Sequence, residues 1–337
     1  MSSTPVMHSA PGIPLKIAIA TYGHTAALKG GQVKIAGVEP NFVEVKPIIA
    51  AFRRMVRDVE FDVCEMAPAT YMIARAAGAP FKALPVSIFR RFHHAGFVTR
   101  GDAGIEVPKD LEGKRAGVRA WSVTTGIWTR GILSEDHGVD LSKITWVVDD
   151  EEHVQSLRLP PNVERAPAGR PLVDLMAEGY LSAAFTANAG IGRAGAPTGG
   201  WRVADGGDAQ TYRELFPDAA AREAEWYRRT GVYPIHGVIV VKDRVLDEHP
   251  QVARALFDAF VESKARYLAQ LARGDTDTDT DTDAHYRAMQ QIVGADPLPY
   301  GIEANRPSID RLIRYCFEQQ LLPRQFAAED MFIDIEG

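Results

Sequence analysis

Residues 61–78 have the sequence FDVCEMAPATYMIARAAG, in which an apolar segment of strand length continues directly into a segment of helical composition. We interpret Phe61–Met66 as a buried strand and Ala67–Ala77 as a helix that ends at Gly78. The same order of strand and helix recurs on both sides, beginning with a strand at Leu15–Tyr22. This alternation is typical of an α/β protein with a mainly parallel sheet covered by helices on both faces.

The alternation is interrupted twice along the chain. Turn-forming residues follow position 100, and the strand–helix order restarts at Lys114–Ala120. After residue 235 a single strand leads into long C-terminal helices. We therefore predict two α/β lobes: residues 1–100 with 235–337 form the first, which holds both chain ends, and residues 101–234 form the second. Two lobes joined by two crossings face each other across a cleft, where small ligands commonly bind.

The composition excludes several classes of function. The 337 residues are 46% hydrophobic and 24% charged, and the formal net charge is −6, so a nucleic-acid partner is not expected. The two cysteines show neither zinc nor disulfide spacing. The polar, proline-containing first 14 residues do not resemble a secretory signal, and no apolar run approaches the roughly 18 residues of a membrane span. We predict a cytoplasmic protein without a membrane partner, for which a homo-oligomer is possible.

An alternating run of Asp and Thr occupies Asp275–Asp283. An EF-hand calcium loop starting at Asp275 would need glycine at position 280 and glutamate at position 286, where this sequence has Thr280 and Tyr286. Five closely spaced carboxylates repel one another and stay solvated. We predict a disordered surface linker between two helices.

Candidate site residues follow from the position of the predicted strand ends. In open α/β sheets, ligands bind outside the carboxyl ends of the strands. This rule selects polar and aromatic residues in both lobes, namely Tyr22, His24, Glu65, Arg90–His94, Arg119, Trp121, Ser122, Thr124, Thr125, Asn188 and His236.

The arginines and the predicted start of a helix among these residues indicate that the site binds carboxylates. Ser122 follows a predicted strand and begins a predicted helix, whose free N–H groups attract anions. Arg91 and Arg119 can each give a planar two-pronged contact to a carboxylate. The alternative is that Ser122 only caps its helix and Arg119 only pairs with a surface acid, and the sequence leaves both interpretations open.

The histidines give no zinc signature. Extended alternation places Arg90, Phe92 and His94 on one face and Arg91 and His93 on the other, so only one histidine of the pair can face a given cleft. No HExxH motif or Cys/His zinc spacing occurs, and we predict no metal ligands in the protein, while a divalent ion shared with a substrate stays open. The remaining histidines are interpreted as surface residues: His137, His153, His249 and His285.

Several of these segments resemble those of a known enzyme family. The chain is similar to the 4,5-dihydroxyphthalate decarboxylase family over Leu15–Ile335, through Tyr22-Gly-His24-Thr25, Cys64-Glu65-Met-Ala-Pro68, Phe89-Arg-Arg-Phe-His-His94, Gly117-Val-Arg119-Ala-Trp121-Ser122-Val-Thr-Thr125 and Tyr233-Pro-Ile-His236-Gly237. The resemblance implies a two-lobed fold like that of the type II periplasmic binding proteins. It also implies conversion of an aromatic dicarboxylate, 4,5-dihydroxyphthalate, to protocatechuate in phthalate catabolism.

The chemistry of this reaction suggests a role for each candidate. A base near the phenol, an acid near the ring carbon and a clamp for the remaining carboxylate are needed, and no electron-sink cofactor is required. We assign acid–base roles to His24, Glu65, His94 and His236, and substrate binding to Tyr22, Arg91, Arg119, Trp121, Ser122, Thr124, Thr125 and Asn188. Two alternatives remain: a solute-binding protein without catalysis, and a decarboxylase for another hydroxylated aromatic acid.

Overall fold

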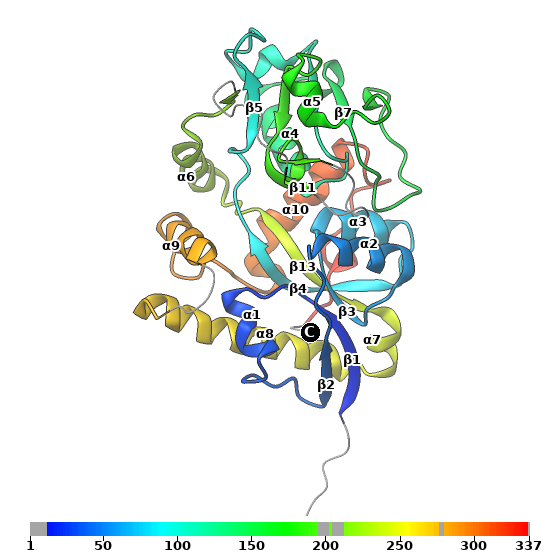
Figure 1. The fold of residues 1–337 in the computed structure, drawn as a ribbon. Helices are drawn as coiled ribbons and strands as arrows, with labels where there is room; N and C mark the ends of the chain where they lie inside the picture. The colour runs from blue at the N-terminus through cyan, green and yellow to red at the C-terminus, as the bar shows by residue number, and fades with distance from the viewer. Residues whose placement is uncertain (1–11, 195–201, 204–211, 276–279, 336–337) are drawn as a thin grey trace, which may run out of the picture.

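The computed structural model describes residues 12–194, 202–203, 212–275 and 280–335. Two separate sheets, each packed against helices, form two lobes (Figure 1). Among the described residues no helix combines the length and the apolar character needed to cross a membrane.

The first lobe is built on a five-stranded sheet. Its strand order is β2-β1-β3-β13-β4, with β1 parallel to β2 and β3, and with β13 antiparallel to β3 and β4. The strands are β1 (Ile13–Ala18), β2 (Val38–Phe42), β3 (Val63–Met66), β4 (Phe81–Arg90) and β13 (Ile235–Lys242). The helices of this lobe are α1 (Gly23–Lys29), α2 (Ile49–Asp58), α3 (Pro68–Ala76), α7 (Asp243–Glu248), α8 (Gln251–Arg273), α9 (Thr280–Val293), α10 (Ile302–Glu318) and α11 (Ala328–Met331).

Burial on both faces explains why the central strands are continuous apolar runs. Along β13, Val238 and Val240 pack into the core that contains α3, whereas Ile239 and Val241 pack into the core that contains α8. Side chains alternate between the two faces of a strand, so a strand covered on both sides must be apolar at every position.

The second lobe is built on a six-stranded sheet of order β12-β5-β9-β6-β7-β8. Strand β6 is parallel to both β7 and β9, while β5 is antiparallel to β9. The elements are β5 (Phe97–Arg100), η1 (Pro108–Leu111), β6 (Arg115–Gly117), α4 (Thr124–His137), η2 (Leu141–Lys143), β7 (Thr145–Val148), β8 (Val163–Arg165), α5 (Leu172–Ala177), β9 (Ala183–Phe185), η3 (Ala187–Ala189), β12 (Tyr212–Glu214) and α6 (Ala219–Thr230), with a small pair β10 (Arg193–Ala194) and β11 (Arg202–Val203) beside them.

The first crossing between lobes lies earlier than the sequence predicted. Strand β5 pairs with β9 and β12 of the second sheet, so the chain leaves the first lobe between residues 91 and 96 rather than at residue 100. The prediction was wrong because β5 is a short strand directly after β4, and only its pairing identifies its sheet.

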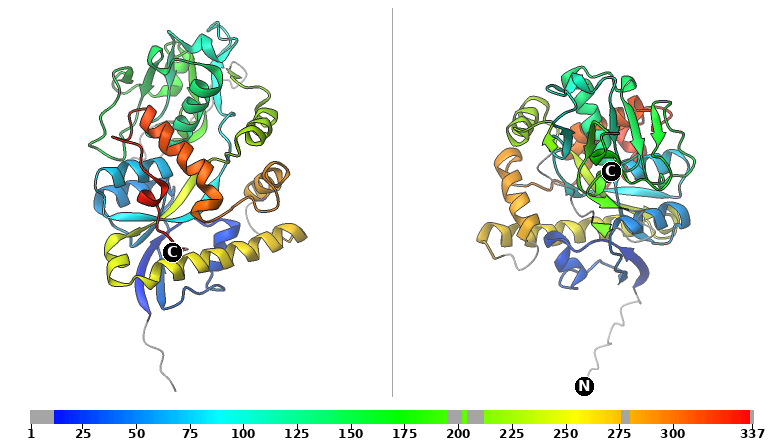
Figure 2. Two further views of the ribbon diagram at one scale, coloured as in Figure 1. Left: turned by 180° about the vertical axis from the view of Figure 1, so that it is seen from behind. Right: turned by 45° about the horizontal axis from the view of Figure 1, so that its top comes forward.

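The C-terminal helix α10 contacts both lobes, although the sequence placed it wholly in the first. It packs against α3 and α4, and Figure 2 shows it running between the lobes. Trp121 Nε1 donates to the carbonyl of Gln319 over 3.1 Å, and Arg130 Nε donates to the Gln319 side chain over 2.7 Å. Glu135 also pairs with Arg311 at 2.6 Å.

Helix α1 begins where the sequence predicted an exit loop. The backbone N–H of Tyr22 donates to Thr25 Oγ1 over 2.8 Å and closes the first turn. Gly23 permits a close approach of α8, since a Cβ atom there would lie 2.2 Å from the Tyr267 ring.

The end of the Asp-Thr run is also helical, because Thr280–Asp283 form the first turn of α9. The buried Asp283 accepts a hydrogen bond from the Tyr267 hydroxyl over 2.6 Å. A disordered linker is therefore the wrong interpretation for these four residues, and residues 276–279 lie outside the described residues.

Candidate active site

A cavity of about 630 Å³ lies between the two lobes. This volume is within the range typical of small-molecule sites. Its wall combines apolar side chains with polar groups from the strand ends of both lobes, including Phe52, Glu65, Thr70, Phe89, Arg91, Phe92, His93, Arg119, Ser122, Thr124, Thr125, His153, Thr186, Asn188, Glu223, His236 and His285.

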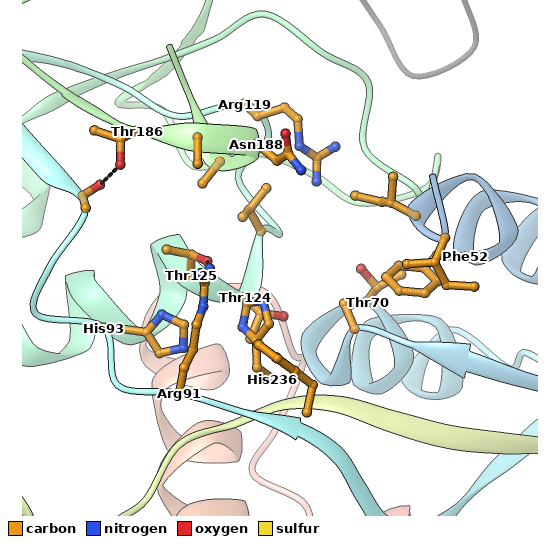
Figure 3. A pocket seen from close by; sticks show the side chains of 18 of the residues that line it. Phe52, Thr70, Arg91, His93, Arg119, Thr124, Thr125, Thr186, Asn188 and His236 are labelled. Carbon is orange, nitrogen blue, oxygen red and sulfur yellow. Dashed lines mark hydrogen bonds between the residues drawn. The ribbon is translucent and has the colours of Figure 1, made fainter. Parts of the chain in front are cut away.

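One group of residues, Arg91, His93, Thr125, Glu223 and His236, is called the Arg91 end of the cavity. Arg91 Nη2 donates to Thr125 Oγ1 over 2.8 Å, and the buried Nε has no hydrogen-bond partner within the described part of the chain. No described carboxylate lies within 4.0 Å of this guanidinium. Arg91 lines the cavity and points into it without a direct ion pair to a described residue, and Glu223 is the carboxyl group that interacts with its charge at longer range (Figure 3).

Two imidazoles lie beside Arg91. The ring centroids of His93 and His236 are 5.1 Å apart, and His93 also stacks on Trp128 at 6.3 Å. Burial, with smaller contributions from Arg91 and other neighbouring groups, holds the pKa of both histidines well below its usual value. At neutral pH both rings are therefore uncharged and can either donate or accept a hydrogen bond.

Two carboxyl groups on the cavity wall retain their protons more strongly than usual. Glu223 of α6 accepts the backbone N–H of His94 over 3.4 Å, and burial raises its pKa to about 7. Glu65, at the end of β3, accepts the Tyr22 hydroxyl over 2.7 Å and the Ala20 N–H over 2.9 Å, and burial raises its pKa too. A carboxyl group with a raised pKa can act as a general acid near neutral pH.

The opposite wall, called the Arg119 end, consists of Arg119, His153 and Asn188. These residues follow three adjacent parallel strands of the second sheet: β6, β7 and β9. Backbone hydrogen bonds join their loops, from the Arg119 N–H to the Ala189 carbonyl at 2.7 Å and from the Asp150 N–H to the Arg119 carbonyl at 3.0 Å. Figure 3 shows Arg119 and Asn188 across the cavity from Arg91 and His236.

Arg119 differs from Arg91 because its charge is already paired. Its Nη1 donates to the buried Asp150 carboxylate over 3.1 Å, and Arg53 lies 3.4 Å from the other oxygen of the same carboxylate. One predicted alternative was that Arg119 pairs with a surface acid. Arg119 does form an ion pair, but its partner Asp150 is buried, and Arg119 also lines the cavity.

Nine of the twelve sequence-predicted site residues line the cavity, and three do not. Those brought together are Tyr22, Glu65, Arg91, Arg119, Ser122, Thr124, Thr125, Asn188 and His236. Those outside the cavity lining are His24, His94 and Trp121.

His24 is buried in the interior of the first lobe rather than in the cleft. Its Nε2 hydrogen-bonds the Ile88 carbonyl at 2.8 Å, and its ring packs against Tyr267 and Tyr286. Burial lowers its pKa to about 4. The prediction of an acid–base role was wrong because α1 begins at Gly23 and turns the side chain toward α8.

His94 and Trp121 point away from the cavity for local reasons. His94 lies on the face opposite His93 and packs against Trp226 and Phe216. Trp121 donates its indole N–H to Gln319, and the Arg130 guanidinium lies 3.6 Å above its ring. Both side chains support the site from behind rather than touch a ligand.

Ser122 does not cap its helix. Helix α4 begins at Thr124, with Val123 at the N-cap position. The Ser122 hydroxyl instead donates to the buried Glu152 carboxylate, which also accepts a hydrogen bond from the backbone N–H of Trp121 over 2.6 Å. The predicted capping role is wrong, and this hydroxyl is already committed to Glu152.

The strand-end rule selected His93 but no role was assigned to it, and Glu223 was not identified at all. The interpretation of His153 and His285 as surface residues was wrong, because both line the cavity. Alternation along the strand end already placed His93 with Arg91, whereas His153 lies five residues beyond the end of β7, after four acidic residues, and the strand-end rule does not single it out. No local signal marks Glu223 or His285, which reach the cavity from α6 and α9.

Within the described residues, no group of three or more His, Cys, Asp or Glu side chains is placed to hold a metal ion. The expectation that the protein uses no resident cofactor stays a prediction.

The chain is similar to two curated proteins over much of its length. It is 32% identical to the 4,5-dihydroxyphthalate decarboxylase of Comamonas testosteroni over 332 residues, which cover 95% of this chain and 96% of that protein. The chain belongs to the 4,5-dihydroxyphthalate decarboxylase family. The protein of the same name from Pseudomonas putida is 38% identical over 177 residues, which cover 50% of this chain and 68% of that protein. Membership of this decarboxylase family, inferred above from motifs, is thus confirmed.

Comparisons of fold agree with this assignment. The family model described as NMT1/THI5 like matches residues 34–157. The periplasmic aliphatic sulphonate binding protein SsuA from Escherichia coli superposes with a TM-score of 0.50 at 12% identity, covering 97% of this chain and 93% of that one. The desulfurization enzyme DSZB superposes with a TM-score of 0.50 at 14% identity, covering 95% and 96%. The predicted two-lobed α/β fold of the periplasmic-binding-protein type is confirmed.

Proposed function

We propose that the protein decarboxylates 4,5-dihydroxyphthalate to protocatechuate, as a carboxy-lyase of phthalate catabolism. The observation that carries the proposal is the Arg91 end of the cavity. There a guanidinium without an ion-pair partner among the described residues lies beside neutral imidazoles and the Glu223 carboxyl group, whose pKa burial raises to about 7. This combination binds an anion and offers it a proton, which is what the reaction needs.

The need for a proton donor follows from the electronic structure of the substrate. Direct loss of CO2 from an aromatic ring leaves an electron pair in the ring plane, where the π system cannot delocalise it. Protonation of the carbon that carries the carboxylate avoids this species. In this substrate each carboxylate is para to a hydroxyl group, and withdrawal of the hydroxyl proton makes that ring carbon basic.

We assign the carboxylate clamp to Arg91 and Thr125. A guanidinium can bind a carboxylate through two parallel hydrogen bonds, and the Thr125 hydroxyl fixes the orientation of the guanidinium plane. His93 and His236 lie beside Arg91 and can hydrogen-bond the second carboxylate. Phe92 also lines the cavity and offers an apolar surface to the departing CO2.

We assign the proton donor to Glu223, with Glu65 as the second carboxyl group within the cavity wall. Glu223 lies close enough to Arg91 to interact with its charge, and burial raises the pKa of Glu223 to about 7, so the carboxyl group can supply a proton near the carboxylate-binding position. Glu65 already accepts two hydrogen bonds, from Tyr22 and Ala20, which makes it a less mobile donor.

The reaction balances with one proton consumed from solvent. As the para hydroxyl proton shifts to a base, the ring carbon forms a bond to the proton of the acid. The bond to the carboxylate then breaks, its electron pair restores the aromatic ring, and CO2 leaves. The phenolate recovers its proton from the base, and the acid is reprotonated by water. The hydroxyl group does the work of an electron sink, so we expect no organic cofactor.

The decisive test is incubation of the purified full chain with 4,5-dihydroxyphthalate, followed by measurement of CO2 and of protocatechuate. We expect both products in equal amounts, with or without a chelator. A stable complex that releases no CO2 would instead favour a solute-binding protein. Fractionation of the native host tests the further expectation that the enzyme is cytoplasmic, and sedimentation tests whether it forms a homo-oligomer.

A further inference from the structure

We propose that the substrate lies across the cavity in a single orientation, with its hydroxyl groups at the Arg119 end, where His153 accepts a hydrogen bond from one of them. Its two carboxylates then lie at the Arg91 end. This inference rests on the proposed function for the identity of the substrate, and it assigns His153 as the residue that recognises the hydroxylated edge of the ring.

His153 is a buried polar side chain whose hydrogen-bonding capacity is unused. It is only 4% exposed and lines the cavity. Neither ring nitrogen has a hydrogen-bond partner among the described residues. An unsatisfied buried polar group is costly, and a ligand hydroxyl that supplies the missing hydrogen bond removes this cost.

The charges at the two ends of the cavity favour this orientation over its reverse. At the Arg91 end the guanidinium has no described carboxylate within 4.0 Å. At the Arg119 end the guanidinium pairs with Asp150, and Glu152 lies on the neighbouring segment, bound to Ser122 and Trp121. Asp150 and Glu152 lie behind Arg119 and Ser122 rather than in the cavity wall, and their charges would repel two substrate carboxylates placed there but not neutral hydroxyl groups. At the Arg91 end the carboxyl group of Glu223 opposes the substrate less, because burial raises its pKa to about 7.

The protonation state of His153 fits an acceptor of hydrogen bonds. Burial lowers its pKa well below the usual value, and Arg119, Arg53 and Arg57 lower it further. The imidazole is therefore neutral and has one nitrogen with a free lone pair. The carboxylates that face the same region, Asp150 and Glu151, are paired with these arginines and leave the lone pair available to a ligand.

The site is also rigid enough to define an orientation. Arg119, His153 and Asn188 come from adjacent parallel strands, and backbone hydrogen bonds cross-link the segments around Arg119. A site that is preorganised in this way discriminates by the hydrogen bond that an analogue fails to make. His153 is then expected to separate hydroxylated from unhydroxylated phthalates.

Two analogues of the substrate test the two ends of the cavity separately. Catechol carries only the hydroxyl groups, and phthalate carries only the carboxylates. We expect H153L to weaken catechol binding about tenfold in calorimetric titrations, the usual effect of one lost hydrogen bond to a buried partner. Phthalate binding to H153L should stay within about twofold of wild type. R91M should instead weaken phthalate binding about tenfold or more and leave catechol binding within about twofold of wild type.

Two further variants separate recognition from a structural effect. H153Q keeps an acceptor and should recover most of the catechol affinity, while H249L, outside the cavity, should change neither affinity. The orientation is overturned if H153L weakens both fragments equally, if it affects only phthalate, or if catechol does not bind wild type. Neither titration requires turnover, so the two proposals can fail separately. If the protein releases no CO2, but H153L weakens only catechol binding and R91M weakens only phthalate binding, the proposed reaction is wrong and the proposed orientation stands.

Discussion

The two ends of the cavity each present one arginine, yet the two arginines differ in what surrounds them. Arg91 hydrogen-bonds a neutral hydroxyl, that of Thr125, whereas Arg119 pairs with the buried Asp150 carboxylate. The charge of Arg91 is therefore offered to a ligand, while that of Arg119 mainly stabilises the protein. The neighbours of an arginine, rather than its presence in a cleft, determine whether it can bind an anion.

The largest effect is expected from removal of the Arg91 charge. R91M should lower kcat/KM for 4,5-dihydroxyphthalate about 10³-fold, since loss of one partner of a desolvated charge pair costs about 4 kcal/mol. Steady-state assays of CO2 release measure this, with R222M on the surface as the control. Activity within tenfold of wild type would show that the carboxylates bind elsewhere.

Substitution of the carboxyl group next to Arg91 should have the next largest effect. E223Q should lower kcat about 10²-fold with little change in KM, because a general acid contributes at least that factor. The pKa of Glu223 is about 7, so the wild-type rate should fall as the pH rises through 7, when the acid loses its proton. The residual activity of E223Q should lack this alkaline decline.

The exposed Glu225 on the same helix gives a matched control, and E225Q should behave as wild type. An E223Q enzyme with an unchanged pH profile would move the role of acid to Glu65, for which E65Q is the corresponding test.

The contrast in ion pairing also predicts a difference in stability. R119M should lower the free energy of unfolding by about 2 kcal/mol, since the buried Asp150 carboxylate loses its shorter ion pair and keeps the longer contact to Arg53 and a hydrogen bond from the Glu151 backbone N–H. R91M should not destabilise the protein, because no described carboxylate loses a partner. Urea denaturation of the two variants compares them directly, and equal destabilisation would contradict the distinction between the two ends.

The smallest effect is expected from the hydroxyl that orients Arg91. T125A should raise KM about fivefold, the usual consequence of losing one hydrogen bond of about 1 kcal/mol. T125S keeps the hydroxyl and should restore the KM of wild type. If T125S and T125A were equally impaired, the methyl group and its packing, and not the hydrogen bond, would explain the role of Thr125.

Much of the site was predictable because strands end where their apolar runs end. Arg91, Arg119 and Asn188 were found in this way, whereas His153 was not, because four acidic residues separate it from the strand that ends at Val148. The choice of His94 over His93 conflicted with the alternation that already grouped His93 with Arg91. The prediction for His24 was wrong for a different reason. Residues 23–25 form the first turn of α1 rather than the predicted loop, and this turn directs the His24 side chain into the interior of the first lobe.

The sequence by itself determined the alternating α/β architecture, the family and most of the polar residues at the strand ends, because hydrophobic periodicity and local motifs are properties of neighbouring residues. Only the tertiary structure decided which sheet β5 joins, that α6 and α9 bring Glu223 and His285 to the cavity, and which arginine has an ionic partner. Pairing, burial and electrostatic compensation depend on residues far apart in the chain, and no local pattern records them.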